Sequence, residues 1–393
     1  MGDTTVADSR DAIPLIAEEP LIRVQRALGL IPKDGPGLLR RALFFALLTW
    51  LPIAIWTFWK GRVAAGGLDE PLLQHFGVHV RCLIAIPLLI LAEGKANAVF
   101  LRLAPHFLDA GLIPDEPAFH AVVQKVARLR DRTLPWVLIA GIVVAWIFLR
   151  PEAHQAHDLL WATDAAHSGS SGFGGWWYSY VARPVYVTLV LAWIWRILIF
   201  TSFMFRISRL PLSLVPTHAD HQGGLGFLAA APGAFSLVIL ALSSVLAAGS
   251  AHDVMYHDVG LQALRLPAAG FLILMLLGFL APLLVFTPVL LVTRRQAKLE
   301  YSALVARHGR AVREKWIEGK PDAQAEPLLT APEIGPVADT ISLYEAVARM
   351  RPLPVGKTSL TAILVPAIIP MIVVIAIRVP IKELLLTIFK ALT

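Results

Sequence analysis

Apolar residues fall into seven long runs along this chain, and polar segments separate the runs. Their approximate limits are Ala42 to Trp59, Leu72 to Ala92, Leu134 to Phe148, Tyr180 to Phe203, Gly226 to Gly249, Pro267 to Val292 and Ser359 to Ile377. A helix needs about 20 apolar residues to cross a hydrocarbon layer of ~30 Å. The pattern therefore predicts an all-α integral membrane bundle with about seven transmembrane helices, for which the lipid bilayer is the first partner.

The composition supports this class. The chain has 393 residues, of which 56% are hydrophobic and 16% are charged, whereas soluble domains are about 45–50% apolar and about 25% charged. The net charge of +7 would suggest nucleic acid in a soluble protein. In a membrane protein, basic residues collect on cytoplasmic loops, so no nucleic-acid partner is expected. The single cysteine, Cys82, excludes an intrachain disulfide.

Lysine and arginine also predict the orientation. If the N-terminus is cytoplasmic, the inner segments hold 25 of these residues and the outer segments hold 5. Because the bias holds for each loop, the positive-inside rule places the N-terminus in the cytoplasm and the C-terminus on the periplasmic side. A re-entrant last segment, returning the C-terminus to the cytoplasm, is the alternative.

Four parts follow in chain order. Residues 1–41 form a polar tail, which includes Glu19, and a short amphipathic helix at the membrane surface. Residues 42–293 form a six-span core with a helical cytoplasmic loop at 93–133. Residues 294–358 form a small cytoplasmic helical subdomain, and residues 359–393 form a proline-kinked last span with an amphipathic tail.

Histidines and carboxylates gather on the predicted outer face. They include His75, His79, His154, His157, Asp158, His252, Asp253 and His257. His75 and His79 are four residues apart and would share one face of a helix. Imidazole and carboxylate groups suit a divalent metal. The alternative is a set of ordinary wet interfacial side chains, since no spacing matches a defined zinc pattern. No other cofactor is expected.

Three arginines lie in or at predicted spans, namely Arg81, Arg183 and Arg196. Arginine within a membrane is costly and usually faces a partner, a bundle interior or a water path. Arg196 is the deepest of the three, and Glu93 is its best candidate partner in the sequence. The arginines either attract an anion along a pathway or form structural pairs.

The fifth span is rich in small residues, among them Gly226, Ser236 and Ser243. Small residues allow helices to approach closely, and they could equally line a narrow pore.

The densest polar stretch runs from Pro216 to Leu228, just before this span. It contains His218, Asp220, His221, Gly223, Gly224 and Gly226. Asp220 can cap the helix that follows. The glycine N–H groups could bind an anion, or the histidines and Asp220 could bind a metal or relay protons. The alternative is a tight packing joint that needs glycine.

The motif H-x-D-x-x-G-G-L-G-F-L, from His218 to Leu228, lies between two spans, and the last span is rich in proline. Together these features resemble a group of uncharacterised multi-spanning inner-membrane proteins of Gram-negative bacteria. The resemblance implies a bacterial origin and an inner-membrane location, and it implies no activity.

Three functions are compatible with the sequence. The first is an oligomeric ion channel or solute-permeation protein, with anions favoured by the arginines, in which Arg196 and the fifth span line the path. The second is a membrane-embedded, metal-dependent enzyme, or one that acts on lipid or phosphate, using His218, Asp220 and His221. The third is a membrane scaffold or sensor that acts through residues 294–358.

Overall fold

The computed structural model describes residues 15–16, 19–32, 35–61, 63, 71–149, 160–162, 172–256, 260, 262–319 and 335–378. Within these ranges every regular element is helical. The α-helices are α1 (Pro20–Ala27), α2 (Leu38–Trp59), α3 (Phe76–His79), α4 (Ile86–Asp109), α5 (Glu116–Arg130), α6 (Leu134–Phe148), α8 (Phe173–Trp177), α9 (Arg183–Ile207), α10 (Ser236–Tyr256), α11 (Arg265–Leu284), α12 (Thr287–Val312), α13 (Gly335–Arg349) and α14 (Lys357–Arg378).

Several of these helices are joined by tighter or wider turns. The 3₁₀ segments are η2 (Leu72–Gln74), η4 (Leu160–Ala162) and η6 (Gly226–Phe235), and the π segments are η3 (Val80–Ala85), η5 (Tyr178–Ala182) and η7 (Arg313–Ile317). When joined segments are counted together, seven helices are long and apolar enough to cross a membrane. The predicted all-α membrane bundle is therefore confirmed.

Four of the spans, with 31 to 35 residues each, are much longer than a bilayer requires. Residues 76–109 form a stretch of 34 residues, which at 1.5 Å per residue is about 51 Å long. The prediction ended this span at Ala92, because the apolar run ends there, but α4 continues as a helix to Asp109. Helix α5 packs against α9 and buries Phe119, Val122 and Val126. The predicted helix in the 93–133 loop is thus confirmed.

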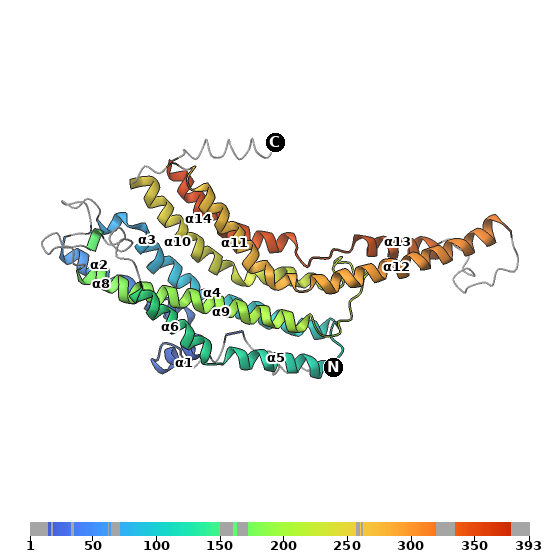
Figure 1. Ribbon diagram of the computed structural model, residues 1–393, viewed down its shortest axis with the longest axis horizontal. Helices are drawn as coiled ribbons and strands as arrows, with labels where there is room; N and C mark the ends of the chain where they lie inside the picture. Colours follow the sequence, from blue (N-terminus) through green and yellow to red (C-terminus); the bar gives the residue numbers. More distant parts are fainter. Residues whose placement is uncertain are drawn as a thin grey trace, which may run out of the picture.

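The helices are arranged in layers (Figure 1). Helices α4 and α9 run side by side through the middle, with α10, α11 and α14 on one side and α1, α5 and α6 on the other. Helix α10 packs along α14, and η6 packs against both α4 and α14. Many small residues of the fifth span therefore lie at helix–helix contacts, whereas Ala230 and Gly249 are exposed. One of them, Ser243, is fully buried and donates a hydrogen bond of 2.5 Å to the carbonyl of Ala367.

Helices α12 and α13 lie side by side and extend away from the spans (Figure 1). Arg294 donates to the carbonyl of Ala348 at 3.1 Å, and the His308 Nδ1 and Thr340 Oγ1 atoms are 3.1 Å apart. Helix α12 begins at Thr287, so the last apolar residues of the predicted sixth span already belong to it. A break at Val285 and Phe286 separates it from α11.

The fifth span opens with an unusual segment. Residues 226–235 form ten residues of 3₁₀ helix before α10 begins at Ser236, although such runs rarely exceed about 4 residues. Pro232 lies inside the segment. Its missing N–H group prevents a regular α-helical hydrogen bond at that position.

Candidate functional site

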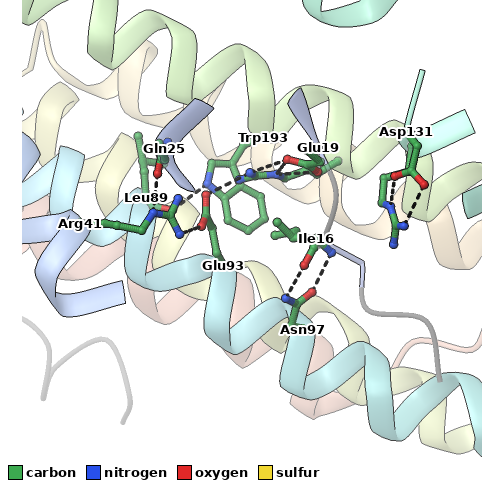
Figure 2. A network of polar contacts seen from close by, with 11 residues as sticks. Ile16, Glu19, Gln25, Arg41, Leu89, Glu93, Asn97, Asp131 and Trp193 are labelled. Carbon is green, nitrogen blue, oxygen red and sulfur yellow. Dashed lines mark hydrogen bonds and ion pairs between the residues drawn. The ribbon is translucent and has the colours of Figure 1, made fainter. Parts of the chain in front are cut away.

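A cluster of four buried ions lies where α2, α4 and α9 meet the start of α1 (Figure 2). The Nη2 atom of Arg196 is 2.8 Å from Glu19 Oε2 and 3.0 Å from Glu93 Oε1. The Nη1 atom of Arg41 is 2.6 Å from Glu93 Oε2. Glu93 therefore bridges the two arginines, and the cluster is electrically balanced.

Burial makes this balance necessary. The exposed fractions are 0% for Glu19 and Arg196, 1% for Arg41 and 2% for Glu93. Each ion has lost several kcal/mol of hydration, which only close opposite charges and hydrogen bonds can offset. Gln25 contributes by accepting a hydrogen bond of 2.5 Å from Arg41 Nε.

Two guanidinium nitrogens of the cluster have no hydrogen-bond partner among the described residues. They are Arg41 Nη2 and Arg196 Nη1, and both are buried. Buried polar groups are normally satisfied by protein, water or a ligand. These two atoms therefore leave room for one more acceptor in the cluster.

A pocket of about 660 Å³ borders the cluster. Its lining residues include Ile16, Ile22, Arg26, Leu38, Arg41, Glu93, Asn97 and Leu101. Arg41 lies in the first turn of α2, and α2 has 22 residues, or a length of about 33 Å. Because this length matches the hydrocarbon layer, the pocket and the ions lie at one edge of that layer.

The sequence predicted part of this site. The Arg196–Glu93 pair is confirmed. Glu19, assigned to a polar tail, is instead fully buried on Arg196, and Arg41 was counted with the cytoplasmic segment. Glu19 and Arg196 are 177 positions apart, so no spacing rule could have paired them. Gln25 is buried in α1 and contacts Arg41 of α2, and nothing in the sequence pattern pointed to it either.

The other two arginines lie around one tyrosine. Arg81 donates to the hydroxyl of Tyr178, and the Arg183 guanidinium lies 4.9 Å from the centre of the Tyr178 ring. Arg81 also lies 5.6 Å from the ring of Tyr186. Such contacts of cations with ring faces are favourable where water is scarce. The three predicted arginines thus belong to two separate places.

The histidines predicted on the outer face separate into two groups. His79 Nδ1 accepts from Trp50 Nε1 at 2.9 Å, and its Nε2 lies 3.0 Å from the carbonyl of Leu72. The His75 ring instead stacks on His252, with ring centres 5.0 Å apart. His75 has ψ 73° and precedes the first residue of α3, so it does not share a helical face with His79.

Some candidate metal ligands cannot be placed. His154, His157, Asp158 and His257 lie outside the described residues. Asp253 is half-buried in α10 beside His252. Among the residues that are described, no three histidine, cysteine or carboxylate side chains gather as a metal site would require.

In the stretch from Pro216 to Leu228, Asp220 accepts hydrogen bonds from the chain itself. Its Oδ1 accepts from the N–H groups of Gln222 at 2.7 Å and Gly224 at 3.2 Å, and its Oδ2 accepts from Gly226 at 2.7 Å. His218 Nδ1 lies 2.9 Å from Oδ1. The N-cap residue of the fifth span is Leu225 rather than Asp220, but Asp220 does satisfy the N–H group of Gly226, the first residue of the span. The N–H groups expected to bind an anion at Gly224 and Gly226 bind this internal carboxylate.

The same stretch joins the fifth span to the end of α13. The N–H group of Arg351 donates to the carbonyl of His221 at 2.7 Å. His221, Gly223 and Gly224 have φ values of 55°, 66° and 96°, a left-handed region that favours glycine. A Cβ atom on Gly223 would lie 3.2 Å from the Met350 side chain. The glycines therefore serve a close contact between segments.

The Asp220 contacts predict a pH dependence of stability. Partial burial by itself would raise the pKa of Asp220, but the hydrogen bonds from Gln222, Gly226, His218 and Gly224 outweigh it and lower the pKa. The stabilisation is complete above the unfolded-state pKa of about 3.9. It is lost as the pH falls through the lower folded-state pKa. We expect the acid unfolding of Asp220→Asn in detergent, followed by circular dichroism, to depend less on pH than wild type. Equal slopes would contradict this.

The two candidate serines of the fifth span, Ser236 and Ser243, both form hydrogen bonds. Ser236 Oγ accepts a 2.5 Å hydrogen bond from Lys95 and donates to the carbonyl of Gly233 at 3.1 Å, and Ser243 joins α10 to α14. A second pocket, of about 440 Å³, lies between α4, α10 and α14. It is bounded by apolar and small side chains, including Leu88, Leu240, Ala247, Ala248, Pro370 and Val373.

The geometry thus assigns the buried ions and the adjoining pocket as the candidate site. No protein-family model matches the chain, and comparisons with curated proteins and with solved structures give no match.

Proposed function

We propose that this membrane protein carries small solutes, anions in particular, across a bacterial inner membrane. The observation that supports the proposal is the pocket of about 660 Å³ that has both Arg41 and Glu93 in its wall. Ionised groups at membrane depth are expensive, and they usually mark a substrate or ion pathway. A pocket of this size suits a small ligand.

The charges of the pocket favour an anion. Its charged lining residues are Arg26, Arg41 and Glu93, which together carry one positive charge at neutral pH. Arg41 also keeps one buried nitrogen unused, as described above. Under this proposal the Lys- and Arg-rich end of the bundle faces the cytoplasm, the pocket is the inner entrance, and the carrier works as a homo-oligomer.

The pocket replaces the path expected from the sequence. Arg196 is fully buried between two carboxylates, and the fifth span packs against neighbouring helices, so neither lines the proposed entrance. For the enzyme alternative, the structure brings His218 and Asp220 together. Asp220 is already held by three backbone N–H groups, which leaves it poorly suited to bind a metal or exchange protons.

Filling the pocket should stop transport without disturbing the ions. Ala98 is an exposed residue in the pocket wall, so we expect Ala98→Trp to reduce anion flux into liposomes at least about tenfold. Ala140 is an exposed position on α6, and Ala140→Trp is the matched control.

The measurement compares wild type, Ala98→Trp and Ala140→Trp in the same liposomes, with acetate, chloride and choline gradients. Wild-type flux that survives in Ala98→Trp would remove the pocket from the pathway. A lack of flux in wild type under every gradient would contradict the proposed function itself.

A further inference from the structure

The segment before α1 enters the interior at Leu15, Ile16 and Glu19, which we call the N-terminal clamp. Leu15 and Ile16 are 3% and 6% exposed. The Ile16 N–H group donates to Asn97 Oδ1 at 2.8 Å, and Asn97 Nδ2 donates to the Ile16 carbonyl at 2.9 Å. Figure 2 shows Ile16 between Asn97 and Glu19, and Glu19 is paired with Arg196.

Glu19 meets Arg196 as a carboxylate ligand would. Its Oε2 accepts from Arg196 Nη2 at 2.8 Å and from Nε at 3.2 Å, and its Oε1 lies 3.3 Å from Nε. Paired N–H groups directed at one carboxylate are the preferred arginine geometry for carboxylate recognition. This carboxylate does not come from a spanning helix. It precedes Pro20, the first residue of the short helix α1.

The clamp also separates the pocket from Arg196. Ile16, Glu93 and Asn97 are part of the pocket wall, whereas Glu19 and Arg196 are not among its lining residues. The unused nitrogens of Arg41 and Arg196 lie buried in the same cluster. Glu19 therefore fills the carboxylate position without using the full donor capacity of the arginines.

Charge balance determines what could enter. Two arginines and two glutamates sum to zero, so an added anion would be an uncompensated buried charge costing several kcal/mol. A carboxylate that replaces Glu19 keeps the sum at zero. Exchange is therefore much less costly than addition, and the exchanged group must carry one negative charge and accept from a planar guanidinium.

From these observations we propose that Glu19 is an internal ligand, and that the pocket receives a small carboxylate which displaces it from Arg196. The clamp then leaves the interior as the solute enters. The transport part of this statement rests on the proposed function, whereas the binding and displacement part does not.

Exposure of the clamp tests displacement directly. The single native cysteine is buried, so Ile16→Cys in a Cys82→Ala background gives one reporter. In nanodiscs, where both faces are accessible, we expect slow labelling by a polar maleimide in chloride. Replacing chloride with acetate or succinate at equal ionic strength should raise the rate about tenfold, by increasing the population of the open clamp. Leu15→Cys serves as a second reporter in case Ile16→Cys perturbs packing.

Two variants test whether the contacts of Asn97 and Glu19 hold the clamp in the interior. Asn97→Ala removes both hydrogen bonds to Ile16 and leaves the ion pairs intact, so labelling should be fast even in chloride. Glu19→Gln should be labelled fast without any carboxylate, because the amide pairs weakly with Arg196. The matched control is Glu116→Gln, at an exposed glutamate in the first turn of α5, and it should label slowly.

The outcomes are distinct. A labelling rate that is the same in chloride, acetate and succinate at both reporter positions would overturn the inference, even if anion flux is observed. Labelling that responds to these carboxylates without any flux would support the binding site and count against the proposed transport. A slow labelling rate in both Asn97→Ala and Glu19→Gln would show that neither contact holds the clamp in the interior, and it would also overturn the inference.

Discussion

Arg196→Met is expected to lower the stability of the folded protein by about 3–5 kcal/mol, the usual cost of removing one partner from a buried ion pair. The reason is that Glu19 and Glu93 would remain buried with only Arg41 to balance them. In the fold, Arg41 Nη1 lies 2.6 Å from Glu93 Oε2, whereas Glu19 has Arg196 as its ion-pair partner. The measurement is the thermal unfolding midpoint in detergent micelles, followed by circular dichroism.

The control lies on the same helix. Arg206 is exposed and its Nε lies 3.4 Å from Ser202 Oγ, so Arg206→Met should change stability by less than about 1 kcal/mol. A second comparison tests the charge argument itself. The double variant Arg196→Met with Glu19→Gln restores the balance of one arginine and one glutamate, and it should be more stable than Arg196→Met alone. A double variant that is less stable than the single one would contradict the account.

Asp220→Ala has the second large expected effect, and we expect it to lower the stability of the folded protein by about 3 kcal/mol. Three backbone N–H groups, at Gln222, Gly224 and Gly226, would lose their acceptor. Each unsatisfied group that stays buried costs about 1–3 kcal/mol, and water will reach some of them. We also expect the contact between His221 and Arg351 to loosen, so that amide hydrogen exchange rises at the ends of both α13 and η6.

Gly226→Ala provides an independent route to the same loss. A Cβ atom there would lie 2.7 Å from Asp220 Cβ and 2.8 Å from its Oδ2, so the carboxylate would have to move. The exposed Asp109 at the end of α4 supplies the control, and Asp109→Ala should leave the unfolding midpoint unchanged. If Asp220→Ala melted like Asp109→Ala, the carboxylate would not be the centre of this joint.

The sequence predicted the bundle well because spans depend on local composition. The lengths of the apolar runs placed all seven helices, and the helical spacing of Phe119, Val122 and Val126 placed α5. The predicted ends of the spans were wrong where a helix continued past its apolar run, as α4 does beyond Ala92. There, helix formation depends on packing outside the membrane rather than on hydropathy.

The candidate site was less accessible to sequence reasoning. Asp220 was predicted as a cap because the cap and its helix are adjacent in the chain. Glu19 was not predicted as part of the site, because its burial depends on four segments meeting. An isolated acidic residue near a chain end is usually solvated. The four-residue spacing of His75 and His79 is informative only if both lie inside one helix. Helix α3 begins at Phe76, so His75 lies outside it.

The long 3₁₀ segment η6 has a geometric consequence for the whole fifth span. A 3₁₀ helix rises about 2.0 Å and turns about 120° per residue, against about 1.5 Å and about 100° for an α-helix. If its ten residues wound into α-helix, the span would shorten by about 5 Å and rotate by about 200° about its axis. Asp220 holds the first residue of this segment through its hydrogen bond from Gly226. The joint at Gly226 therefore sets both the axial position of α10 and its rotation about the helix axis.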